Sequence, residues 1–148
     1  MPPGEEEALK AMSEPPPVSG NPDVIARHLV NVYKALGAAD DDDILFERAL
    51  DHVVNRNWDP MSVNRQVAAV VIGEGCDRRN ELAQLKVPAM VIHGDSDPLV
   101  TLESGKDIAK SIPGAELCVI KGLGHDISIK YVDEISECIL KGVTRYRQ

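Results

Sequence analysis

The chain has 148 residues, a length typical of one domain, and its hydrophobic fraction of 43% predicts a folded protein rather than a disordered one. Its net charge of −8 and aromatic fraction of 3% argue against nucleic acid as a partner, because phosphates would be repelled and few rings could stack on bases. No apolar run approaches the roughly 20 residues that span a bilayer, and the acidic amino terminus differs from a secretory leader. We therefore expect a cytoplasmic protein without a membrane partner.

Three cysteines are present, and neither their number nor their spacing points to a metal or redox site. The set is odd and lacks Cys-x-x-Cys spacing; its members are Cys76, Cys118 and Cys138. We therefore expect reduced, partly buried thiols, as in most cytoplasmic proteins. The sequence implies no cofactor.

The first part of the chain predicts helices and no strand. Residues 1–20 are rich in proline and glutamate, so apart from a short helix near Glu5 to Met12 we expect an extended, mobile lead-in. Residues 21–80 are expected to form a helical, cap-like segment with three helices. Their starts are Asn21-Pro22, the aspartate run Asp40 to Asp43, and Asp59-Pro60. A polar residue before proline is typical of a helix start, and we interpret the aspartates as a helix cap rather than a cation site.

Residues 81–148 predict a different, α/β part. The elements alternate in type: a strand at Val87 to His93, a helix at about Leu102 to Ile112, a strand at Glu116 to Lys121 and a helix at about Lys130 to Val143. This order predicts a right-handed crossover and a parallel pair of strands. The first strand is continuously apolar, which is typical of a central strand covered on both faces. Because two parallel strands do not make a stable sheet alone, we expect further strands to be missing upstream.

An acid and a base follow the two predicted strands. Asp97 comes just after the first strand, and His125 comes just after the second, behind Gly122 and Gly124. The carboxyl ends of parallel strands meet at one edge of a sheet, so these loops are expected to lie together. In a nucleophilic triad, a carboxylate orients the histidine that takes a proton from the nucleophile. The sequence therefore predicts Asp97 and His125 as a catalytic acid and base.

Residues 82 to 129 resemble the carboxyl-terminal end of the α/β-hydrolase superfamily. The resemblance is carried by Pro-x-x-x-Ile-His-Gly-x-x-Asp-Pro-Leu-Val, which begins at Pro88, and by Gly-x-Gly-His, which ends at His125. In that family the triad residues come in the order Ser, Asp, His. The resemblance implies that Asp97 is the triad acid and His125 the triad base, and that the helical segment is the family's cap. It extends in particular to small-molecule esterases and haloperoxidase-like members with a helical lid.

The sequence contains no Gly-x-Ser-x-Gly, the motif that carries the family's nucleophile. We therefore expect a partial α/β-hydrolase fold, with the helical cap followed by the last two strands and their helices. Such a chain would be inactive alone. Completed by an amino-terminal half with the serine, it would act on a small, apolar, ester-type substrate.

Other polar residues near the predicted site have weaker claims. Asp95 is the second candidate for the acid, but the family's acid directly precedes the proline. Asp126 is expected to cap the following turn. Ser96 and Ser104 lack the strand-to-helix elbow that activates a serine nucleophile. We expect structural roles for the remaining histidines, His28, His52 and His93.

Two other functions are compatible with the sequence. His93, Asp95, Asp97 and His125 contain donors that could hold a metal, although no paired histidine spacing supports this. Alternatively, the chain is a non-catalytic remnant or association module. In that case, an exposed edge of the strand at Val87 to His93 would pair with another strand, in a second copy or in a different partner.

Overall fold

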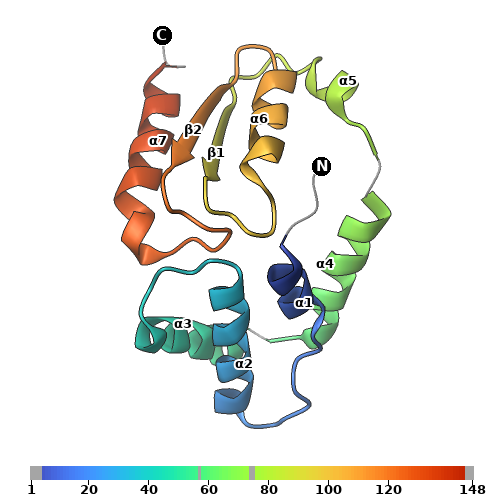
Figure 1. Cartoon of the computed structure of the whole chain (residues 1–148), viewed down its shortest axis with the longest axis vertical. Coiled ribbons are helices and arrows are strands. Elements are labelled where there is room, and N and C mark those ends of the chain that lie inside the picture. The colour runs from blue at the N-terminus through green and yellow to red at the C-terminus, as the bar shows by residue number, and fades with distance from the viewer. Residues whose placement is uncertain (1–4, 57, 74–75, 146–148) are drawn as a thin grey trace.

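The computed structural model describes residues 5–56, 58–73 and 76–145, which form a layer of helices below a small α/β layer (Figure 1). The first layer contains α1 (Glu6–Ser13), α2 (Pro22–Ala35), α3 (Asp42–Asn55) and α4 (Pro60–Gly73). The short helix α5 (Arg79–Leu82) leads into the second layer. This layer contains β1 (Met90–Gly94), α6 (Leu102–Ser111), β2 (Glu116–Ile120), the 3-10 turn η1 (Ile129–Tyr131) and α7 (Val132–Arg145).

The helical layer is organised around the packing of α2 against α3. The α2 helix begins where the sequence predicts, because the Asn21 side chain accepts a hydrogen bond from the Asp23 N–H (2.9 Å) and Pro22 occupies the first turn. Leu45 and Ala49 of α3 are fully buried against α2. This apolar contact fixes the loop between the two helices, which reaches the candidate site.

The α/β layer has the predicted parallel pair of strands. β1 and β2 pair in parallel from Met90 opposite Glu116 to Gly94 opposite Ile120, so the prediction of a parallel pair is confirmed. Both α6 and α7 pack on the strands, one on each side of the pair (Figure 1). The loops that leave β1 and β2 therefore emerge side by side at the edge of the sheet that faces the helical layer.

The first strand differs from its prediction in length and burial. It begins at Met90 rather than Val87, and Val87 is 61% exposed. Within β1, Val91 and Ile92 are only half-buried, whereas the sequence predicts a strand covered on both faces. The cause is that β1 has a single strand neighbour among the described residues, which leaves part of its surface uncovered.

In the described part of the chain, no helix combines the length and the apolar character needed to cross a membrane.

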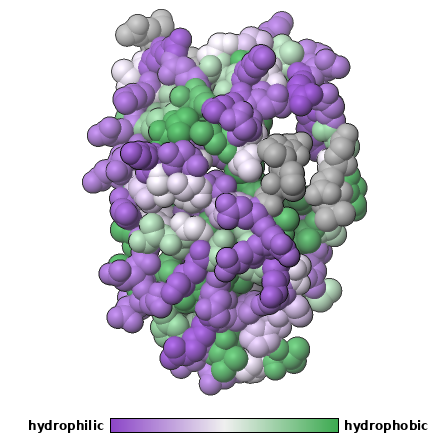
Figure 2. All heavy atoms as spheres, in the orientation of Figure 1, coloured by the Kyte–Doolittle hydropathy of each residue, from purple (hydrophilic) through white to green (hydrophobic). Residues whose placement is uncertain are grey.

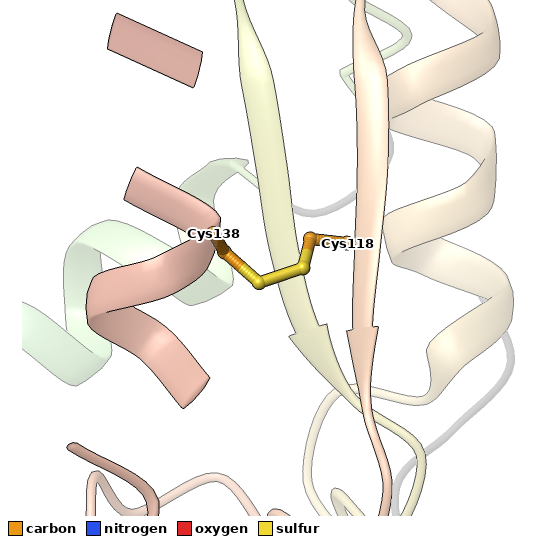
Figure 3. Close-up of a disulfide and its surroundings, with 2 residues drawn as sticks. All are labelled: Cys118 and Cys138. Carbon is orange, nitrogen blue, oxygen red and sulfur yellow. A yellow bond between two sulfur atoms is a disulfide. The ribbon is translucent and has the colours of Figure 1, made fainter. Parts of the chain in front are cut away.

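The prediction of three reduced thiols is wrong for two of the cysteines. Cys118 on β2 and Cys138 on α7 form a disulfide, with their Cα atoms 6.2 Å apart (Figure 3). Cys76 is the free thiol of the described residues and is exposed. The spacing of the cysteines could not reveal the pair, because it forms only when α7 packs against the sheet.

Hydrophobic side chains are not confined to the interior. On the face shown in Figure 2, hydrophobic patches lie among the polar side chains that cover most of the surface. On α4, Val70 is 67% exposed, and Ile72 is also exposed. These apolar side chains of α4 therefore do not pack against the described residues.

Candidate active site

Asp97 lies in the loop that leaves β1 and is held there by the backbone. Its Oδ1 accepts hydrogen bonds from the N–H groups of Leu99 (2.9 Å) and Val100 (2.8 Å), so the loop forms an Asx-type turn. Its side chain is 6% exposed. One carboxylate oxygen thus stabilises the turn, and the other, Oδ2, is left for a second partner.

That second partner is His125, from the loop that leaves β2. The distance between His125 Nδ1 and Asp97 Oδ2 is 2.9 Å. A carboxylate accepts but cannot donate, so this contact places the imidazole proton on Nδ1. Nε2 is then the nitrogen that can exchange a proton with a reacting group, and the side chain is 38% exposed. The structure brings the predicted acid and base together in the arrangement that a triad requires.

His93 contacts the acid loop from the end of β1. Its Nε2 lies 2.8 Å from the Val100 carbonyl oxygen and 3.7 Å from Asp97 Oδ2. The shorter contact, to a carbonyl, requires a donor, so Nε2 carries the proton. His93 therefore has the structural, hydrogen-bonded role that the sequence predicts, and it holds the far end of the Asp97 turn.

Asp95 serves a different purpose from Asp97. Its Oδ1 accepts hydrogen bonds from the Gly122 N–H (2.6 Å) and the Ser96 hydroxyl (3.0 Å). The hydrogen bond from Gly122, and to a smaller extent that from Ser96, holds the pKa of the Asp95 carboxyl below its ordinary value. Asp95 therefore links the loop after β1 to the loop after β2, and its carboxylate binds Gly122 and Ser96 rather than His125.

Glycines allow the loop of His125 to approach its neighbours closely. Gly122 has a φ of +79°, a conformation that other residues rarely adopt. A Cβ on Gly124 would lie 2.5 Å from the Gly37 carbonyl oxygen, so a side chain there would separate the histidine loop from the helical layer. The two glycines before His125 are thus required for the position of the loop.

The remaining candidates lie apart from this pair. The Ser96 hydroxyl donates to Asp95, and Ser104 is buried in α6, where its hydroxyl has no hydrogen-bond partner among the described residues. His52 packs edge-on against the Trp58 ring, with their centroids 5.6 Å apart. Within the described ranges, no three His, Cys, Asp or Glu side chains are placed to hold a metal ion. An open hollow of about 690 Å³, lined by residues 83–88, 113 and 114, does not include Asp97 or His125.

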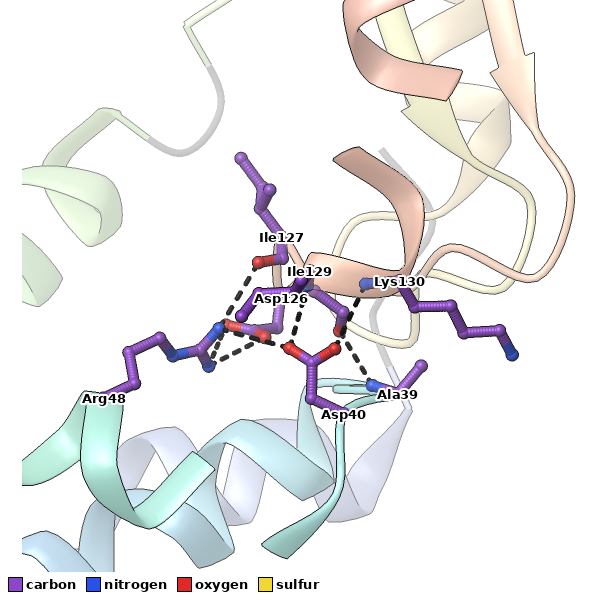
Figure 4. A network of polar contacts seen from close by, with 8 residues as sticks. Ala39, Asp40, Arg48, Asp126, Ile127, Ile129 and Lys130 are labelled. Atoms are coloured by element: carbon purple, nitrogen blue, oxygen red, sulfur yellow. Dashed lines mark hydrogen bonds and ion pairs between the residues drawn. The ribbon is translucent and has the colours of Figure 1, made fainter. Parts of the chain in front are cut away.

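The structure reveals a polar network beside His125 that sequence reasoning missed (Figure 4). The sequence predicts that Asp126 caps the following turn, but the structure shows a different partner for its side chain. Its two carboxylate oxygens instead accept from Arg48 NH2 at 2.9 and 2.8 Å. Nothing in the sequence links these residues, because they are 78 positions apart and meet only when α3 lies under the histidine loop.

The aspartate run is used differently from its prediction. Asp41 is at the N-cap of α3 but makes no side-chain cap bond, and the exposed Asp42 pairs with Lys34 (2.8 Å). Asp40 instead accepts from the N–H groups of Ile129 (2.9 Å) and Lys130 (3.2 Å). It therefore satisfies the start of η1, in the other layer, because the loop before α3 lies directly beside that turn (Figure 4).

Comparison with known proteins relates the chain to the α/β hydrolase fold. Residues 59–130 match the family model of the α/β hydrolase fold. Lipase 1 of Psychrobacter immobilis is 31% identical over 41% of this chain and 19% of its own length. Non-heme chloroperoxidase CPO-A1 of Kitasatospora aureofaciens is 37% identical over 36% of this chain and 20% of its own length.

Among solved structures, the meta-cleavage product hydrolase CumD of Pseudomonas fluorescens IP01 superposes with a TM-score of 0.64 at 16% identity. The match covers 97% of this chain and 51% of CumD. The chain thus spans about half the length of that hydrolase, and 19% and 20% of the length of the two curated relatives above. The family-model match, the curated relatives and the shared fold together support the assignment of this chain to the α/β-hydrolase superfamily.

Proposed function

We propose that this chain supplies the acid and the base of a serine-hydrolase triad. The observation that carries the proposal is the 2.9 Å contact between His125 Nδ1 and Asp97 Oδ2, with Asp97 buried and its other oxygen held by two backbone N–H groups. This is the geometry in which a carboxylate fixes the histidine tautomer and stabilises the imidazolium.

In the proposed reaction, a serine supplied from outside residues 1–148 attacks the acyl carbon of an ester. His125 Nε2 takes the serine proton as the new C–O bond forms, and then gives it to the oxygen of the departing alcohol. Water repeats the sequence to release the acid and the serine. Asp97 stays ionised throughout and holds the Nδ1–H of His125.

The substrate class that we propose is a small, apolar ester. The similarity to a protein named as a lipase supports an ester substrate. The exposed apolar residues of α4, such as Val70, supply a surface that an acyl chain could cover. Alone, the chain is expected to be inactive.

Complementation tests the proposal. The chain is mixed or co-expressed with the part of an α/β-hydrolase that carries the Gly-x-Ser-x-Gly elbow, and hydrolysis of p-nitrophenyl butyrate is measured. We expect activity in the mixture, a loss of several orders of magnitude with His125→Ala, and a loss of about 10⁴-fold with Asp97→Asn. His28→Gln, a change in α2, is the matched control and should leave the rate unchanged. Equal activity with and without His125 would contradict the proposal.

A second candidate function is association through the open side of β1. The half-burial of Val91 and Ile92, and the single strand neighbour of β1 among the described residues, favour it. Light scattering coupled to size-exclusion chromatography tests this function on the chain alone. A dimer or larger species that a charged substitution such as Val91→Lys dissociates would support it, whereas a stable monomer would count against it.

A further inference from the structure

The loop of His125 is bonded to the helical layer at every residue from His125 to Lys130. The Leu36 carbonyl oxygen accepts from the backbone N–H groups of His125 (2.8 Å) and Asp126 (3.3 Å). Ser128, which is fully buried, accepts from the Ala39 N–H at 2.8 Å. The remaining residues of this loop bind the side chains of Arg48 and Asp40.

Arg48 is the cation at the centre of these contacts (Figure 4). It donates to both carboxylate oxygens of Asp126 and to the Ile127 carbonyl oxygen at 3.3 Å. A second carboxylate, that of the buried Asp40, lies 3.9 Å away. The guanidinium also stacks on the Tyr33 ring, 4.4 Å from its centroid.

The burial of this ion pair distinguishes it from an ordinary surface salt bridge. The side chains of Arg48 and Asp126 are 31% and 14% exposed, whereas those of Lys34 and Asp42, an ion pair within the helical layer, are 50% and 70% exposed. An exposed pair contributes little because water screens it, but removal of Arg48 would leave the mostly buried Asp126 carboxylate without its cation. Removal of Arg48 should therefore move the segment that carries Asp126.

We propose that Arg48 and Asp126 are positioning residues for His125. This inference rests on the proposed function of His125 as the base. Asp126 is the next residue after His125, and the two share the Leu36 carbonyl as a backbone acceptor. The ion pair fixes the main chain at that point, so that the imidazole stays at hydrogen-bond distance from Asp97. The helical layer thereby sets the geometry of the acid and base as well as covering the site.

The tautomer of His125 is the direct readout of this role. A histidine held at Asp97 carries its proton on Nδ1, and a histidine released from Asp97 redistributes the proton to Nε2. The nitrogen chemical shifts of the imidazole measure this ratio by NMR on the isolated chain, at about pH 9, well above the ordinary pKa of an imidazole. A role in stability alone would leave the ratio unchanged in the folded protein.

The variants compared are Arg48→Met, Asp126→Asn, Arg48→Lys and the control Lys34→Met, which breaks the exposed ion pair instead. We expect the Nδ1–H form to dominate in the unsubstituted chain and in the control. In Arg48→Met and Asp126→Asn, the ratio of Nδ1–H to Nε2–H should fall about fivefold or more, the lower range of coupling between sites. Arg48→Lys, which keeps a cation opposite Asp126, should restore part of the ratio.

Each outcome decides one question. An unchanged ratio in folded Arg48→Met overturns the inference. If that variant does not fold, the nearly isosteric Asp126→Asn decides, and an unchanged ratio there also overturns it. If the unsubstituted chain itself lacks the Nδ1–H form, the proposed function fails before the positioning role is reached. If the unsubstituted complemented enzyme is active and Arg48→Met lowers kcat together with the tautomer ratio, the proposed function of His125 and the positioning role of Arg48 are both supported.

Discussion

Reduction of the disulfide between Cys118 and Cys138 should lower the free energy of unfolding by about 3 kcal/mol. The bond joins residues 20 positions apart, one on β2 and one on α7, and so closes a loop in the unfolded chain. A loop of that length lowers the chain entropy by about 11 cal/mol/K, which corresponds to about 3 kcal/mol at 25 °C. Cys138 remains in the core after reduction, so the main change is the entropy regained by the unfolded chain.

The assay is urea unfolding followed by circular dichroism, with and without a phosphine reductant, in a Cys76→Ser background that prevents thiol exchange. With a slope of about 1–3 kcal/mol/M, the midpoint should fall by about 1–3 M on reduction. The double variant Cys118→Ser/Cys138→Ser is the control, and its midpoint should not respond to reductant. The reasoning is refuted if reductant leaves the midpoint of the parent unchanged, or if the unreduced, unfolded parent titrates two free thiols.

Three further predictions concern the candidate site and the core. Gly124→Ala should destabilise the chain by about 1–3 kcal/mol, because its Cβ meets backbone atoms, whereas Gly20→Ala, with nothing within 4 Å, should be neutral in the same urea assay. Asp95→Asn should destabilise the chain above about pH 4, and this difference should shrink as the pH falls through the lowered pKa of folded Asp95, because its bond to Gly122 stabilises the ionised form. A difference in stability between variant and parent that is the same at about pH 7 as it is well below about pH 4 would contradict this. Leu45→Ala, in the fully buried centre of α3, should cost about 2–5 kcal/mol, and a smaller loss in thermal unfolding would show a core that collapses around the gap.

Local signals predicted most of the secondary structure. The start of α2 at Pro22 follows from the capping side chain of Asn21, an interaction between neighbours in the chain. The parallel strands follow from the alternation of strand and helix, since a helical crossover between two neighbouring strands brings the second strand back in the same direction as the first. The short helix α5 was not predicted, because four residues are too few to show a periodic pattern.

The candidate acid and base could be predicted for the same reason. Asp97 and His125 each follow a strand directly, and parallel strands bring their carboxyl ends to one edge. The sequence alone also separated Asp97 from Asp95, through the proline that follows the acid in the α/β-hydrolase pattern. In the structure Asp97 contacts His125, and Asp95 is bonded to Gly122 instead.

What the sequence by itself determined is therefore most of the helices and strands, the parallel order of the two strands and the meeting of Asp97 with His125, because each follows from residues close together in the chain. The tertiary structure decided the contacts between distant segments. It joined Cys118 to Cys138, it placed Arg48 of α3 against Asp126, and it left β1 half-buried. Contacts of this kind depend on how the layers pack, and no local pattern of polarity or spacing records which side chain a buried cysteine or carboxylate will meet.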